Sequence, residues 1–139
     1  MKNNSKLLSR EEFKQEVFKR NDGFCVFCQK PAVDAHHILD RKLFTDGGYY
    51  IDNGAPVCEA HHWACERTDI RVEEVRKNCG IETLRLPEGF SQDKQYDKWG
   101  NEYLPSGMIK PGPLINDDGC KKMLKHKWHL IELTNDTNL

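Results

Sequence analysis

Two short pairs of metal-ligating residues constrain the fold of this chain more than any other feature. One pair is Cys25-x-x-Cys28 and the other is Cys58-x-x-His61. Structural zinc takes four ligands in a tetrahedron, mostly thiolate and imidazole groups, and proteins usually supply them as two closely spaced pairs. The sequence therefore predicts a structural Zn²⁺ ion that fastens the segment near residue 25 to the segment near residue 58.

The composition also favours a metal-stabilised domain. Of the 139 residues, 37% are hydrophobic and 31% are charged, so we expect one domain, or a compact domain with an extension, around a small core. Small cores often need a further stabilising element, and a structural metal is a common one. In a reducing compartment, the six cysteines and their accompanying histidines fit metal binding better than a disulfide framework.

Charge and apolar pattern bear on partners and location. The net charge of −1 argues against nucleic-acid binding through a strong overall basic field, although it leaves room for a local basic face. No apolar run approaches the length of a membrane helix, and the first residues lack the apolar stretch of a signal peptide. We therefore expect a soluble, cytoplasmic protein with no membrane partner, and the sequence indicates no oligomeric state.

Local patterns predict the elements around the two ligand pairs. Ser9 followed by Glu12 has the pattern of a capping box, which predicts a helix from Arg10 to Asn21. Short strands are predicted at residues 24–28, 31–39 and 49–51, and helices at residues 59–67 and 71–78. The order around the ligand pairs is thus a metal knuckle, two strands and a helix.

Proline and glycine punctuate the chain after Ile81. Gly100-Asn101 predicts a two-residue hairpin turn, and a last short helix is expected from Cys120 to His129. We expect Trp99 and Trp128 to be buried anchors. The predicted organisation is an N-terminal helix at residues 1–23, a zinc-containing core at residues 24–81 and a C-terminal extension packed on the core at residues 82–139.

The helix predicted to begin near Cys58 should point the side chains of His61 and His62 in different directions. Cys58 and His61 are three residues apart, so their side chains face the same way and can complete the zinc site. His62 is rotated by about 100° from His61 and faces elsewhere. The 29 residues between the two pairs leave room for a hairpin that carries His36 and His37. A zinc ion that clamps hairpin to helix would bring these two histidines opposite His62.

Several of these residues also have plainer interpretations. His36, His37 and His62 can be surface or core histidines of a purely structural zinc domain. Glu66, one turn after His62, can face the same site, although a solvated carboxylate is the favoured interpretation, and Asp34 can orient a histidine. The remaining cysteines are expected to be thiols that bind no metal: Cys65, Cys79 and Cys120.

The two adjacent histidines set a geometric condition. A regular strand places neighbouring side chains on opposite faces. His36 and His37 can therefore address one site only if the backbone bends there, as the strand gives way to the loop near Asp40. An unbroken strand through both histidines would weaken the case for a shared site.

The motif residues, taken together, resemble a known family. Cys25-x-x-Cys28, Ala35-His36-His37-Ile38, Asn53 and Cys58-x-x-His61-His62 are similar to the motifs of the zinc-containing HNH endonucleases. The resemblance covers roughly residues 24–67. It implies an α+β fold, with a small zinc-stapled ββα-metal (treble-clef) core, flanking helices and an irregular C-terminal extension. Many members have cysteine at the fourth zinc position, where this chain has His61.

The resemblance also implies roles for individual residues. His37 would be the general base that takes a proton from the attacking water. His36 would be the first ligand of a catalytic divalent ion and His62 the second, with Asn53 bracing the loop between the strands and helping to orient the base. The catalytic ion would be Mg²⁺, Mn²⁺ or Ni²⁺, with Zn²⁺ confined to the cysteine site.

The expected function is therefore a metal-dependent endonuclease that hydrolyses nucleic-acid phosphodiesters. Double-stranded DNA is the expected partner, although an RNA-cutting enzyme would use the same residues. Histidine, with an ordinary pKa of about 6.5, can accept a proton at neutral pH. The alternative is a non-catalytic, zinc-stabilised module that binds nucleic acid or protein.

Overall fold

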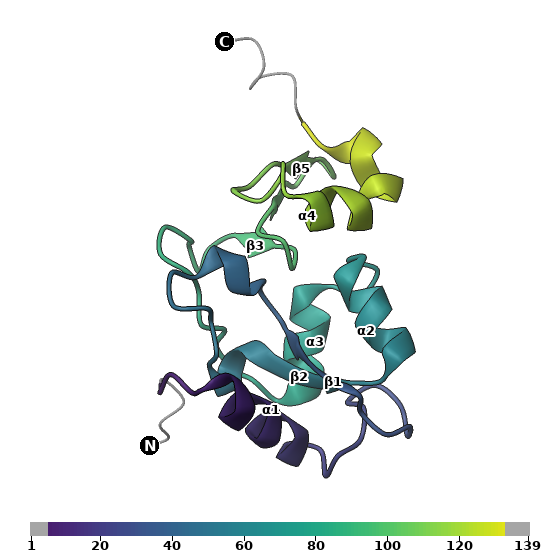
Figure 1. Ribbon diagram of the computed structural model, residues 1–139. Helices are drawn as coiled ribbons and strands as arrows, with labels where there is room; N and C mark the ends of the chain where they lie inside the picture. The colour runs from purple at the N-terminus through teal and green to yellow at the C-terminus, as the bar shows by residue number, and fades with distance from the viewer. Residues whose placement is uncertain (1–5, 133–139) are drawn as a thin grey trace.

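Short helices and strands, joined by long irregular segments, make up the computed structural model, which describes residues 6–132 (Figure 1). The helices are α1 (Arg10–Lys19), α2 (Glu59–Glu66), α3 (Val72–Cys79) and α4 (Asp118–Met123). The strands are β1 (Asp34–His37), β2 (Gly54–Val57), β3 (Gln95–Tyr96), β4 (Glu102–Tyr103) and β5 (Ile109–Lys110). Three 3₁₀ segments are η1 (Arg41–Leu43), η2 (Ile51–Asn53) and η3 (Lys125–Leu130). This confirms the predicted α+β class.

Helix α1 begins at the predicted capping box. The Ser9 hydroxyl accepts a hydrogen bond from the Glu12 N–H, and the Glu12 carboxylate accepts one from the Ser9 N–H. Both bonds satisfy N–H groups that have no partner within the helix. Phe13 and Val17 are the buried residues of α1, and they lie so close to Gly54 that a Cβ there would collide with both. The helix therefore packs directly on the β2 backbone.

Strands β1 and β2 form an antiparallel hairpin between helices (Figure 1). His37 pairs with Gly54 on the face that α1 covers, and His36 pairs with Ala55 on the face that α2 approaches. The main core lies around this hairpin, α2 and α3, and its buried residues include Ile38, Leu39, Ala55, Val57, Cys65, Val72, Val75 and Ile81. The hairpin is thus held between the N-terminal helix and the two helices that follow it.

The predicted strand at residues 24–28 is wrong. Phe24 makes a single bridge with Pro31, and the chain then turns through a run of bends. Within that turn the Cys25 N–H donates to the Lys30 carbonyl, and the Phe27 N–H donates to the Cys25 sulfur. Local hydrogen bonds to the thiol side chain therefore replace a strand ladder with a tight knuckle.

The predicted strand at residues 49–51 is also wrong. The chain enters η2 there, and the partner of β1 is β2, which begins at Gly54. The aromatic side chains that suggested a strand make separate contacts instead. Tyr49 meets the Phe13 ring edge-on, and the Tyr50 hydroxyl donates to Asp46 at 2.5 Å. Tertiary contacts have overridden the strand propensity of these residues.

The two helices after the hairpin match the predictions to within one residue at either end. Gly80 ends α3 in the left-handed region, with φ of 70°, where glycine carries no steric penalty. Val72 and Val75 are buried, and the half-buried Cys79 packs against the main core as predicted. In the described part of the chain, no helix has the length and apolarity required to cross a membrane.

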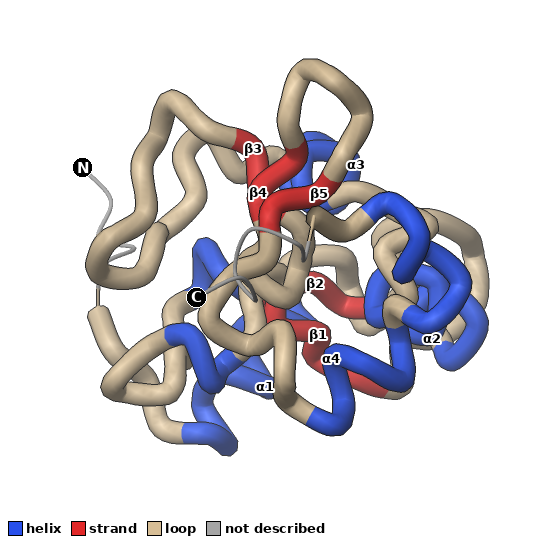
Figure 2. Tube along the Cα trace, turned by 90° about the horizontal axis from the view of Figure 1, so that it is seen from above, coloured by secondary structure: helices blue, strands red, loops and turns tan. Residues whose placement is uncertain are grey.

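The last part of the described chain, which includes β5 and α4 in the upper part of Figure 1, has a core of its own, whereas Leu84, Leu86 and Tyr96 pack against the main core. Figure 2 shows the three-stranded antiparallel sheet, β3-β4-β5, as separate from the β1-β2 hairpin. The buried residues of this second core are Trp99, Ile109, Cys120, Leu124 and Ile131. Trp99 is thus buried as predicted, and Trp128 packs against the same cluster while partly exposed.

Two predictions for this part need correction. The hairpin around Gly100-Asn101 has a longer connection than two residues, because Tyr96 pairs with Glu102. The Asp97 carboxylate holds this connection by accepting hydrogen bonds from the N–H groups of residues 99 and 101. The predicted helix at residues 120–129 is divided, because Leu124 leaves helical geometry between α4 and η3.

Hydrogen bonds join the C-terminal residues to the main core. The Trp99 indole N–H donates to the Glu66 carbonyl at 2.9 Å. The Lys127 ammonium donates to the carbonyl and the hydroxyl of Thr68, at 2.9 and 2.8 Å. Both contacts lie at the end of α2, so this helix is shared between the two parts of the molecule.

Candidate metal centres and groove

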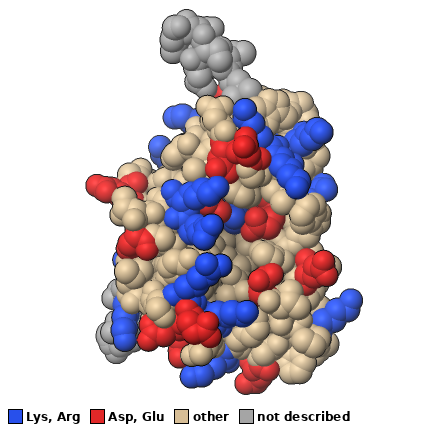
Figure 3. All heavy atoms as spheres, in the orientation of Figure 1, with Lys and Arg blue, Asp and Glu red and all other residues tan. Residues whose placement is uncertain are grey.

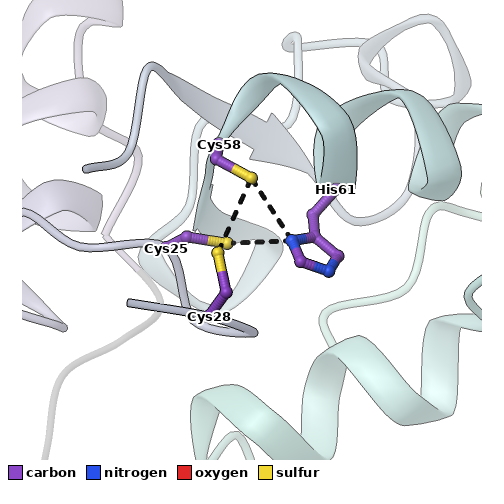
Figure 4. Close-up of side chains that lie close together, drawn as sticks. All are labelled: Cys25, Cys28, Cys58 and His61. Carbon is purple, nitrogen blue, oxygen red and sulfur yellow. Dashed lines mark hydrogen bonds between the residues drawn. The ribbon is translucent and has the colours of Figure 1, made fainter. Parts of the chain in front are cut away.

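Four side chains from the two predicted ligand pairs converge on one point (Figure 4). The Nδ1 atom of His61 lies 3.5 Å from the Cys25 sulfur and 3.3 Å from the Cys58 sulfur. The sulfurs of Cys28 and Cys58 are 3.8 Å apart. The knuckle supplies two of these ligands, and the start of α2 supplies the other two. All four ligand atoms lie within 4.8 Å of one another.

These distances fit a tetrahedral zinc site. With Zn–S bonds of about 2.3 Å, the edge of a sulfur tetrahedron is about 3.8 Å. Sulfurs in a disulfide lie about 2.05 Å apart, and Cys28 and Cys58 are free thiols. The Cys₃His cluster can therefore hold a structural metal ion such as zinc, as predicted from the spacing of the two pairs.

The hydrogen bonds of the cluster favour a thiolate. Burial acts to raise the pKa of Cys58, but hydrogen bonds with the backbone and ring of His61 and with the neighbouring thiols bring it down to about 6. The thiolate is the form that binds metal. Outside the cluster, burial raises the pKa of both the Cys65 and Cys120 thiols to about 12, which fits the prediction that neither is a ligand.

A second group of ligand atoms lies between β1 and α2. It consists of His36, His62 and Glu66, whose candidate ligand atoms all lie within 4.8 Å of one another. The Oε2 atom of Glu66 is 3.3 Å from His36 Nδ1 and 3.4 Å from His62 Nε2. His36 is 1% exposed, and within the described residues the Glu66 carboxylate approaches its Nδ1 without good hydrogen-bond geometry. A buried imidazole nitrogen that faces a carboxylate and a second histidine is an arrangement that suits a metal ligand.

Glu66 contributes more than the sequence interpretation allowed. The solvated carboxylate favoured from the sequence is not observed, because the side chain is 19% exposed and faces both histidines. One sequence feature could have indicated this position. Glu66 follows His62 by four residues, which places both side chains on one face of a helix. Burial acts to raise the pKa of Glu66, but hydrogen bonds with the two histidines and the charge of Lys98 keep it far below the ordinary range.

Asp34 orients His62. Its Oδ2 atom lies 3.2 Å from His62 Nδ1, while the opposite ring nitrogen faces Glu66. A carboxylate on the far nitrogen fixes the tautomer and the direction of a ligating imidazole. The hydrogen bond with Glu66 is the main reason why the pKa of His62 is raised, and burial acts in the opposite direction.

A lysine from the C-terminal residues also reaches the cluster. The Nζ atom of Lys98 lies 2.5 Å from Asp40 Oδ1 and 3.2 Å from Glu66 Oε2, and the residue is only 6% exposed. Nothing in the sequence indicated this contact, because residues 40 and 98 are 58 positions apart. The ammonium places a positive charge beside a candidate metal ligand, and two carboxylates balance it.

His37 lies on the opposite face of β1. Its ring stacks on Phe13 with centroids 4.7 Å apart and meets Tyr49 edge-on at 5.0 Å. Burial lowers the pKa of His37 to about 4, and the charges of His36 and Lys98 act in the same direction. Its Nε2 atom has no hydrogen-bond partner in the part of the chain that the structure describes. A neutral imidazole with a free nitrogen is the form that accepts a proton.

Strand β1 runs through both histidines without the predicted bend, so their side chains point to opposite faces. His37 lines a groove of about 660 Å³ together with Asp34 from β1 and His62 and Glu66 from α2, whereas His36 is buried on the other face and does not line it. The predicted condition for a site shared by both histidines is therefore not met. Their link is indirect, through Glu66 and His62, which line the groove and also approach His36.

Asn53 braces the loop between the strands. Its Oδ1 accepts a hydrogen bond from the Leu39 N–H at 2.9 Å, and its Nδ2 donates to the carbonyls of Leu39 and Gly48 at 3.0 and 3.2 Å. The side chain is fully buried. Gly48 directly precedes Tyr49, whose ring contacts His37, so Asn53 supports the loop that faces this histidine.

No family model, curated protein or solved structure matches this chain. The geometry alone therefore decides which of the predicted residues belong together. It unites the four predicted zinc ligands in one cluster and places His36 and His62 in a second one with Glu66. His37 lines the groove beside that second cluster, and Asn53 supports the adjoining loop.

Proposed function

We propose that this protein is a metal-dependent endonuclease that hydrolyses nucleic-acid phosphodiesters, with DNA as its main substrate. The observation that carries the proposal is the second cluster, because two of its three candidate ligands, His62 and Glu66, line a groove that His37 also lines. The order of knuckle, hairpin and helix supports the resemblance to the HNH endonucleases, and with it a ββα-metal, treble-clef core.

His36, His62 and Glu66 would hold the divalent ion, for which the resemblance suggests Mg²⁺, Mn²⁺ or Ni²⁺. When bound, such an ion supplies Lewis-acid stabilisation to the phosphoryl oxygens and to the departing oxygen. Asp34 would keep His62 directed at the ion. Lys98 would offset part of the negative charge of Asp40 and Glu66, so that these carboxylates repel a phosphate diester less.

His37 would act as the general base. Its Nε2, which has no hydrogen-bond partner within the described residues, would accept a proton from the attacking water. Its lowered pKa keeps the ring neutral at physiological pH. Positioned general bases contribute about 10²–10⁴-fold to such reactions.

One observation favours the alternative, a zinc-stabilised binding module without catalysis. The Nε2 atom of His37 is enclosed between the Phe13 and Tyr49 rings rather than exposed to solvent. Hydrolysis requires this nitrogen to meet water, so one of the covering side chains must move during the reaction. The two functions therefore make different predictions for removal of the His37 imidazole. A nuclease should lose its cleavage activity, whereas a binding module has no cleavage activity to lose.

The deciding experiment compares His37→Ala with the unmodified protein on supercoiled plasmid DNA and on single-stranded DNA, with Mg²⁺, Mn²⁺ and Ni²⁺ supplied in turn. The proposal expects the variant to cleave about 10²–10⁴-fold more slowly while it keeps its zinc and its folded circular-dichroism spectrum. His129→Ala is the matched control, because His129 is exposed and lies in neither cluster. Absence of cleavage by the unmodified protein with every ion would favour the binding module.

A further inference from the structure

A second groove meets the first at the candidate catalytic cluster. It has a volume of about 930 Å³, and His62 and Glu66 line it as well as the first groove. Much of its remaining wall is apolar and consists of Pro31, Val33, Ala60, Trp63 and Met123. The cluster therefore lies where two grooves of different chemistry join.

Trp63 is the largest apolar side chain in this second groove. It follows His62 directly on α2 and is 51% exposed, and Val33 in the same groove is 50% exposed. Within the described residues, no aromatic ring or cation stacks on the Trp63 indole. An exposed tryptophan beside a second exposed apolar residue typically marks a binding surface.

Charged side chains of both signs line the first groove. Its basic residues are Arg10, Lys14, Arg41 and Lys98, and its acidic residues are Glu11, Asp34, Asp40 and Glu66. Figure 3 shows Lys and Arg side chains along the middle of the face that leads down to α1, with Asp and Glu side chains next to them. The exposed cations of this groove, Arg10, Lys14 and Arg41, can contact the oxygens of a phosphate backbone, and a divalent ion at the cluster would offset the nearby carboxylates.

We infer that Trp63 is a stacking platform for an unpaired nucleobase of the substrate strand. This inference rests on the proposed nuclease function and narrows its substrate class to strands with an unpaired nucleotide at the cleavage site. The backbone would lie on the cations of the first groove, the scissile phosphate at the cluster and the adjacent base on Trp63. Within a duplex the base faces are stacked on one another, so an indole can reach one only where the strand is unpaired.

Binding is tested in the His37→Ala background, where cleavage does not consume the probe, with short single-stranded oligothymidylate. Loss of one base–aromatic stack corresponds to about 5- to 100-fold weaker binding, which is the effect expected of Trp63→Ala. Trp63→Phe keeps an aromatic face and should bind nearly as well. It should nevertheless lose the fluorescence quenching that the oligonucleotide causes, because the two remaining tryptophans, Trp99 and Trp128, pack in the second core and line neither groove.

Leu7→Ala serves as the control, since Leu7 is 45% exposed and lines neither groove. It should bind the oligonucleotide like the parent protein. Unchanged affinity in Trp63→Ala, or quenching that persists in Trp63→Phe, overturns the inference, while plasmid cleavage by protein with an intact His37 would still support the nuclease. If the parent protein binds no nucleic acid and cuts none, both proposals are wrong.

Discussion

The Oε2 atom of Glu66 lies 3.3 Å from Nδ1 of His36, although Glu66 is on α2 and His36 is on β1. The Cys₃His cluster explains how these two elements stay together. It joins the knuckle that precedes β1 to the first turn of α2. A structural metal ion there would fix the helix against the hairpin and so set the geometry of the second cluster.

Loss of the first metal site should therefore unfold the main core. We expect the purified protein to contain one Zn²⁺ and expect Cys28→Ser to lose it. Structural zinc binding is worth roughly 10–16 kcal/mol, which is as large as the whole stability of a typical domain. Circular dichroism and metal analysis check this expectation, with Cys79→Ser as a cysteine control outside the cluster. Zinc bound normally by Cys28→Ser would contradict the assignment.

Glu66→Gln should weaken divalent-ion binding at the second cluster. The substitution keeps the shape of the side chain but removes the anionic oxygen that faces His36 and His62. We expect Mn²⁺ affinity, followed by electron paramagnetic resonance, to fall by at least the roughly 10–100-fold typical of lost supporting ligands, with structural zinc retained. Glu74→Gln, on the exposed face of α3, should bind Mn²⁺ normally. Equal affinity in both variants would exclude Glu66 as a ligand.

The buried histidines predict an unusual pH response. Burial lowers the pKa of His36 and of His37 to about 4, so neither ring should titrate between pH 5.5 and 8 in NMR spectra. The unfolded chain, with ordinary histidines near pKa 6.5, binds more protons between pH 4 and 6.5. The free energy of unfolding should therefore fall as the pH drops through that window. A His37 titration midpoint near 6.5 would contradict the enclosed geometry.

Asn53→Ala should destabilise the loop that faces His37. The substitution leaves the N–H of Leu39 and the carbonyls of Leu39 and Gly48 without their side-chain partner. With about 1 kcal/mol for each lost hydrogen bond and a further cost for buried unpaired groups, the free energy of unfolding should drop by about 2–4 kcal/mol. Urea denaturation measures this change. Asn21→Ala, at an exposed turn, is the comparison and should cost less.

Lys98→Met should leave a buried carboxylate without its partner. Asp40 is 7% exposed and has the Lys98 ammonium at 2.5 Å, so removal of that charge should cost about 3–5 kcal/mol. Because the ammonium also lies beside Glu66, its loss should strengthen Mn²⁺ binding by the remaining ligands. The exposed pair of Lys42 and Asp117 gives the contrast, since Lys42→Met should cost no more than about 1 kcal/mol.

The residues of the zinc cluster, the capped helix α1 and the two helices after the hairpin could all be predicted from the sequence. Each depends on neighbours within a few positions, namely a ligand spacing of three, a capping pair or a glycine stop. The strands at residues 24–28 and 49–51 could not be predicted correctly. There, hydrogen bonds to a thiol and contacts of single aromatic rings outweighed the local strand propensity.

The sequence by itself determined which side chains can bind metal, because ligand chemistry and short spacings are local properties. Only the tertiary structure decided that Glu66 faces His36 and that Lys98 reaches the same cluster from 58 positions away from Asp40. It also placed the two adjacent histidines on opposite faces of an unbroken strand, where only His37 lines the groove. These relationships depend on how hairpin, helix and C-terminal residues pack, and such packing leaves no trace in local spacing.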